Sequence, residues 1–102
     1  MKSHFEVMSR LGKLIQVSQD RWELIVTKKH TSIAGREREV RLALIEPEQV
    51  RRSKSDPDVY LYYRAFGGRH LCVVAKHHNG DGFIVTAYFT KRVKVGERIW
   101  PK

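Results

Sequence analysis

The stretch that decides the fold is GFIVTAYFT, residues 82–90. Its residues alternate in character, as in a β-strand whose two faces meet different surroundings. The apolar set predicts the buried face, and the other set carries two threonines and a tyrosine. The apolar set is Phe83, Val85, Ala87 and Phe89, and the opposite set is Ile84, Thr86, Tyr88 and Thr90. The stretch therefore predicts a core strand with a hydroxyl-bearing second face.

Two further strand signals precede this stretch, VYLYYRAF (59–66) and RHLCVVAK (69–76). The separating sequences, GG and HNGDG, suit hairpin turns and predict an antiparallel meander. In the first strand either parity could be buried, and the hydrophobic set Val59, Leu61 and Tyr63 is the better core candidate. That choice leaves Tyr60, Tyr62 and Arg64 on the open side. In the second strand Lys76 shares a face with Cys72 and Val74, and we place these beside the threonines and the tyrosine.

The N-terminal half has a different period. Alternation of apolar and polar residues on both sides of Gly12 suggests a hairpin within residues 4–18. The spacing of apolar residues then predicts helices over 19–30 and 36–46. Pro47 ends the second helix. The expected fold is α+β: two N-terminal helices, with this hairpin before them, packed on one face of an antiparallel sheet of about four strands. Val93, Val95 and Trp100 in the tail are candidate anchors against the sheet or the first helix.

Length and composition predict a single folded domain over residues 1–102. The chain has 102 residues, 41% of them hydrophobic, which is sufficient for one modest core. Its one cysteine, Cys72, lies in an apolar run and excludes an internal disulfide. We find no apolar signal region and no transmembrane run, so we expect a cytoplasmic protein without a membrane partner.

The formal charge of +9 is concentrated in the second half of the chain. Residues 1–50 hold nine Lys/Arg against seven Asp/Glu, whereas residues 51–102 hold eleven against four. Such an excess favours a polyanionic partner, because each neutralised phosphate releases counterions. Nucleic acid is the leading interpretation; an acidic protein partner and a charged face that serves only solubility are the alternatives.

The predicted open face has the residue types that RNA recognition uses: cations for phosphate, rings for base stacking and hydroxyls that donate hydrogen bonds. Thr and Tyr are also ordinary residues of exposed strands, so a merely solvated face stays open as an alternative. His30 closes the run TKKH between the two expected helices. It could act as a general acid or base, or could interact only with a helix C-terminus. His77 and His78 point to opposite faces of a strand, and we expect neither a metal site nor a cofactor.

The segment KHTSIAGREREVRLALIEPEQVRRSKSDPDVYLYYR, followed by LCVVAK and GFIVTAYFT, resembles a group of small prokaryotic and phage-associated domains. These are distant relatives of the ribonuclease fold of barnase, EndoU, colicin-type ribonucleases and RelE toxins. The resemblance runs from about Trp22 to Trp100. It implies a RelE/barnase-like domain that cleaves RNA without a metal, through attack of the 2′-OH on the adjacent phosphate.

The resemblance implies a role for each candidate residue. His30 would be the acid/base, Arg52 and Lys76 would stabilise charge, and Thr86, Tyr88 and Thr90 would orient phosphate. Ser53, Tyr60, Tyr62 and Arg64 would contact RNA. We therefore expect a toxin-type endoribonuclease, held in check by an acidic antitoxin or inhibitor protein. The alternatives are a nucleic-acid-binding module without catalysis that uses the same basic face, and a protein–protein adaptor with an acidic partner.

Overall fold

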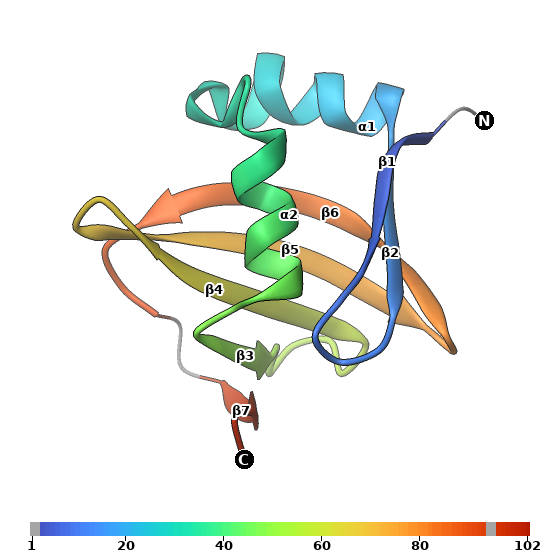
Figure 1. Cartoon of the computed structure of the whole chain (residues 1–102), viewed down its shortest axis with the longest axis vertical. Coiled ribbons are helices and arrows are strands. Elements are labelled where there is room, and N and C mark those ends of the chain that lie inside the picture. Colours follow the sequence, from blue (N-terminus) through green and yellow to red (C-terminus); the bar gives the residue numbers. More distant parts are fainter. Residues whose placement is uncertain (1–2, 94–95) are drawn as a thin grey trace.

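The computed structural model describes residues 3–93 and 96–102. Within these residues, seven strands form one sheet in the order β1-β2-β6-β5-β4-β3-β7 (Figure 1). All neighbouring strands are antiparallel except β2 and β6, which are parallel. The strands are β1 (Ser3–Met8), β2 (Leu14–Ser18), β3 (Gln49–Arg52), β4 (Val59–Phe66), β5 (Arg69–His78), β6 (Asp81–Thr90) and β7 (Glu97–Trp100).

The helical elements are short. The helix α1 (Gln19–Leu24) continues as a π-helical segment over Ile25–Lys29, and a 3₁₀ turn over Thr31–Ile33 leads to α2 (Glu37–Ile45). Ser18 caps α1, because its Oγ accepts a hydrogen bond from the Arg21 N–H at 3.1 Å. In the described part of the chain, no helix has the length and apolar character needed to cross a bilayer.

The prediction of two N-terminal helices on an antiparallel sheet of about four strands is wrong. Of the described residues, 48% lie in strands and 23% in helices, so the fold is mostly sheet. The predicted hairpin of residues 4–18 forms, but it adds β1 and β2 to the main sheet through the parallel pair. The tail adds β7 beside β3. The expected helix over 19–30 leaves α geometry at the β-branched run Ile25, Val26 and Thr27, residues that lose side-chain freedom in an α-helix.

The strand β6 contains a β-bulge that changes which residues it buries. Val74 pairs with Thr86 and the next residue, Ala75, pairs with Ile84, so Val85 is the extra residue. After the bulge, Ala87 and Phe89 pack in the core as their alternation predicts. Before the bulge the prediction is wrong, because Ile84 is fully buried and Phe83 is 42% exposed. Because of the bulge, Ile84 lies on the same face of the sheet as Ala87, and Phe83 lies on the opposite face.

The main core lies between the sheet and the helices. In Figure 1, α2 crosses the sheet in front of β4, β5 and β6, and its buried residues are Val40, Ala43 and Leu44. Trp22 and Ile25 cover the adjoining part of the core. Burial of these large apolar side chains supplies the main stabilisation, at about 25 cal/mol per Å² removed from water.

The opposite face of the sheet has a second, smaller core. Leu61, Tyr63 and Cys72 are at most 5% exposed there, and Val74, Tyr88 and Val93 pack against them. Val93 belongs to the connection from β6 to β7, which joins strands on opposite sides of β5, β4 and β3. Trp100 packs against the main core, whereas Val95 lies outside the described residues. The face that we predicted to be open is therefore partly covered.

A buried polar network connects the first hairpin to β4 and β5. The Tyr62 hydroxyl donates to Ser9 Oγ at 3.0 Å and pairs with His77 Nε2 at 2.9 Å. The His77 ring also stacks on Tyr60, with 3.8 Å between ring centroids. Burial of the ring lowers the pKa of His77 from 6.5 to about 4, because the charged form loses hydration. At neutral pH His77 is therefore uncharged.

The network makes stability depend on pH. Because the folded-state pKa of His77 lies below its ordinary value, the unfolded chain binds the extra proton between pH 6.5 and about 4. The free energy of unfolding should have its full value above pH 6.5 and fall by about 2–3 kcal/mol as the pH decreases to 4. Urea unfolding over this range measures the loss. His77→Phe keeps a ring against Tyr60 and should flatten the profile; the exposed His78→Gln should not. Equal profiles for wild type and His77→Phe would contradict this assignment.

A second prediction concerns Gly82, where β6 pairs with β5 and β2 at once. A Cβ atom on Gly82 would lie 2.4 Å from the Lys76 carbonyl oxygen and 3.0 Å from Ile15 Cδ1. Gly82→Ala should destabilise the fold by roughly 1–3 kcal/mol, as for other overpacked sites. Gly80→Ala is the matched control, since no atom lies within 4 Å of its Cβ position. Chemical denaturation measures both, and equal midpoints would contradict the close approach.

Candidate functional site

Residues 24–36, 59–80 and 82–96 are three segments that contain no Asp or Glu, among several in the chain. Each of them holds three Lys or Arg residues. The fold brings all three together where β6 ends, beside the β4–β5 turn and the helical turns before α2 (Figure 1). We call this region the basic end. It comprises Lys28, Lys29, His30, Arg36, Arg69, Lys91 and Arg92.

Ring contacts hold the basic end together. The His30 ring lies against Tyr88 of β6, with 5.5 Å between ring centroids. A second set of contacts forms a ladder across β4 and β6. Its three contacts are Arg36 over Phe66 at 5.0 Å, Phe66 against Phe89 at 5.1 Å, and Arg69 over Phe89 at 4.5 Å. Each cation–π contact contributes on the order of 0.5–1 kcal/mol at an exposed site and fixes the position of a guanidinium group.

Local backbone features position these cations. Gly67 and Gly68 both have positive φ angles, 54° and 80°, as a two-residue type I′ hairpin turn requires. The turn places Phe66 and Arg69 opposite each other. At the end of β6, Thr90 Oγ1 donates to the Arg92 carbonyl oxygen at 3.0 Å and accepts from the Arg92 N–H at 3.2 Å. This closed turn leaves Lys91 and Arg92 exposed to solvent.

The cations of the basic end are poorly neutralised. Arg36 lies 3.9 Å from a Glu39 carboxylate oxygen. Within residues 3–93 and 96–102, no ion pair involves Lys28, Lys29, Lys91 or Arg92. Cations that are free of carboxylates attract an anion without first breaking an internal contact. The basic end is therefore suited to bind several negative groups at once.

The structure brings some of the predicted catalytic residues to the basic end. His30 contacts Tyr88, and Thr90 closes the neighbouring turn. Thr86 lies on the same face of β6, but its Oγ1 is buried and has no hydrogen-bond partner in the described part of the chain. Burial, with Cys72 and Tyr63 as neighbours, raises the pKa of Tyr88. The Tyr88 phenol is therefore a neutral group and not a base.

The predicted charge stabilisers lie elsewhere. Arg52 pairs with Glu97 of β7 at 2.5 Å, and this contact raises the pKa of its guanidinium group. Lys76 shares the face of Cys72 and Val74, as predicted, but its Nζ lies 3.5 Å from an Asp56 carboxylate oxygen. Both cations already have a carboxylate partner. They do not join His30 in one site.

The predicted RNA-contacting residues do not form the expected open surface. Tyr62 is fully buried in the main core, and Tyr60 packs against that core, so these two lie on the opposite face from the one we predicted. Arg64 Nη1 donates to the Glu46 carbonyl oxygen at 2.5 Å. Ser53 Oγ pairs with Ser55 Oγ at 3.1 Å in the connector to β4. The reason is the parity of β4, since Leu61 and Tyr63 fill the smaller core instead.

Sequence reasoning missed most of the basic end, namely Lys28, Lys29, Arg36, Arg69, Lys91 and Arg92. The signal was present in the three segments without carboxylates, but only the fold shows that they meet. Among the described residues, no group of three His, Cys, Asp or Glu side chains is placed to hold a metal ion. Comparisons with protein families, with curated proteins and with solved structures find no match for this chain.

Proposed function

We propose that this protein binds nucleic acid, with RNA as the leading class, through the basic end. The observation that carries the proposal is the convergence of three carboxylate-free segments on one end of the sheet. Regularly spaced phosphates match a group of exposed, unpaired cations, and their condensed counterions are released on binding. The neighbouring rings of Phe66, Phe89 and Tyr88 add the aromatic character that nucleic-acid surfaces use.

Binding without catalysis is the function that the geometry supports best. Cleavage of RNA by the 2′-OH needs a base, an acid and cations around the phosphorus in one place. Arg52 and Lys76, the cations that we assigned to this task, are each paired with a carboxylate away from His30. The basic end has cations of its own, but they lie where they would hold the phosphate backbone.

Binding to labelled RNA, followed by fluorescence anisotropy across a salt series, tests this proposal. The affinity should fall steeply with salt, because the slope of log K against log salt is about −0.7 per neutralised phosphate for single strands. Lys91→Ala combined with Arg92→Ala should weaken binding and make this slope shallower by about 1.4. Lys54→Ala combined with Lys102→Ala is the matched control, since it removes the same charge from exposed positions outside the basic end.

Two outcomes would contradict the proposal. Absence of binding to RNA and DNA at low salt would exclude a nucleic-acid partner. An equal loss of affinity in the two double variants would mean that binding depends on net charge alone and not on the basic end. Thermal unfolding of each variant establishes that the fold is retained, as expected for exposed side chains.

A second candidate function is favoured by one contact, that between His30 and Tyr88 at the basic end. A histidine beside bound phosphates could serve as the acid/base of a metal-independent ribonuclease. An acidic inhibitor or antitoxin would then cover the same cations. The fold differs from the four-stranded sheet that the resemblance to such ribonucleases implied, so this candidate depends on the site alone.

Incubation of mixed RNA with the protein in EDTA tests the second candidate. Cleavage to cyclic-phosphate and 5′-OH ends is the expected product, and His30→Ala combined with Tyr88→Phe should abolish it. His78→Ala, at an exposed position in β5, is the control and should cleave like wild type. Intact RNA after long incubation, or cleavage that persists in the double variant, would exclude this activity.

A further inference from the structure

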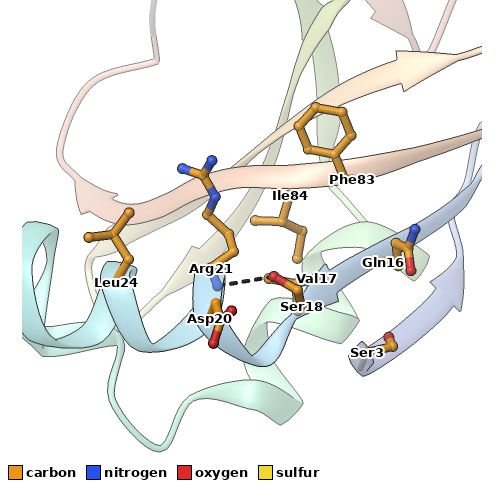
Figure 2. A pocket seen from close by; sticks show the side chains of 9 residues that line it. All are labelled: Ser3, Gln16, Val17, Ser18, Asp20, Arg21, Leu24, Phe83 and Ile84. Carbon is orange, nitrogen blue, oxygen red and sulfur yellow. Dashed lines mark hydrogen bonds between the residues drawn. The ribbon is translucent and has the colours of Figure 1, made fainter. Parts of the chain in front are cut away.

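A cleft opens where β2 and β6 separate. The two strands pair in parallel only over residues 14–16 and 81–83, after which β2 ends and α1 begins. The space between β2, α1 and β6 is a cleft of about 480 Å³ (Figure 2). This volume falls within the range of roughly 300–1,000 Å³ that is typical of sites for small ligands. The cleft is distinct from the basic end and lies at the opposite half of β6.

The walls of the cleft are apolar, and polar groups stand at its rim. Phe83 is 42% exposed and Leu24 is 39% exposed, whereas Ile84 closes the base of the cleft. In Figure 2 the Arg21 side chain extends from α1 toward β6, on the side where the Phe83 ring stands. Gln16 lines the other end of the cleft from β2.

The polar groups at the rim are available for a ligand. The structure has no hydrogen bond or ion pair from the Arg21 guanidinium or the Gln16 amide to another described residue. Asp20 is the one carboxylate among the lining residues, and in Figure 2 it points away from Phe83. An exposed ring, a cation beside it and a free amide suit a flat ligand with an aromatic face and polar edges.

The cleft is connected to the basic end along one face of β6. Phe83 pairs with Lys76, Thr86 with Val74 and Tyr88 with Cys72. Because the three β5 residues share a face, so do Phe83, Thr86 and Tyr88. Because Val85 bulges, Phe83 and Tyr88 lie opposite residues that are four steps apart in β5, about 13 Å at 3.3 Å per residue. Lys76 lies next to Phe83, but its Nζ is already paired with Asp56 at 3.5 Å.

From these observations we propose that the cleft binds an unstacked base of a single-stranded nucleic acid whose backbone runs along β6 to the basic end. The inference rests on the proposed function and adds that the nucleic acid is single-stranded. The base stacks on Phe83, and Arg21 and Gln16 meet its polar edges. A duplex keeps its bases stacked and paired, so it reaches only the basic end. The protein therefore prefers single strands.

Substitution of Phe83 tests the inference. Phe83→Ala should bind a short labelled oligouridine about 5- to 150-fold more weakly, because stacking of a base on an aromatic ring contributes roughly 1–3 kcal/mol. Phe83→Leu should lose nearly as much, since it keeps apolar area but not the ring. Binding of an RNA duplex of the same length should not change, and neither should the salt slope. Ile45→Ala is the control, with a similar exposed fraction of 40% for the wild-type side chain.

A separate readout locates the base directly. An oligonucleotide with 4-thiouridine, irradiated on wild-type protein, should crosslink to the peptide that contains Phe83. Unchanged oligouridine affinity in Phe83→Ala would overturn the inference while the proposed function stands. An equal loss of affinity for single strands and duplex would overturn it as well. If wild type binds no nucleic acid of either form, the proposed function fails first and the inference with it.

Discussion

The close approach of three strands at Gly82 is the constraint on which the fold depends. Here β6 pairs with His77 of β5 on one side and with Ile15 of β2 on the other, and a Cβ atom would meet the Lys76 carbonyl oxygen at 2.4 Å. The pairing with β2 is parallel, so β2 runs toward the same end of the sheet as β6. The chain that leaves β2 through α1 therefore arrives at the C-terminal end of β6, where His30 meets Tyr88.

The direction of this one pair also determines where charge gathers. The parallel pairing delivers Lys28 and Lys29 to the end where β6 continues into Lys91 and Arg92, and the hairpin β4–β5 brings Arg69 to the same end. The bulge at Val85 has a separate effect, because it turns Phe83 outward beside Lys76 while Ile84 fills the core. Backbone pairing therefore places an exposed ring near the start of β6 and free cations at its end. The charge and the aromatic ring then determine what each end can bind.

Strand positions could be predicted because alternation is a local property. The stretches 59–66 and 82–90 lie in strands, and the hairpin around Gly12 formed. Which face a strand buries was harder to predict. In β4 both parities carry aromatic residues. We expected Leu61 and Tyr63 in the main core, but Tyr62 is buried there and they fill the smaller core, so the choice was wrong. Among the candidate site residues, His30 and Tyr88 are in contact, because both lie near the end of β6. Arg52 instead pairs with Glu97 of β7, a strand that we did not predict.

The sequence by itself determined the strands β4, β5 and β6, the net charge of +9 and the absence of carboxylates from residues 24–36, 59–80 and 82–96. Each of these follows from residue identity and local spacing. Only the tertiary structure decided that β2 joins β6 in parallel, that Val85 bulges and that the three segments converge. These depend on backbone pairing between residues far apart in the chain, such as Gln16 and Phe83. Local alternation contains no information about which distant strand is the neighbour, because any strand edge offers the same backbone donors and acceptors.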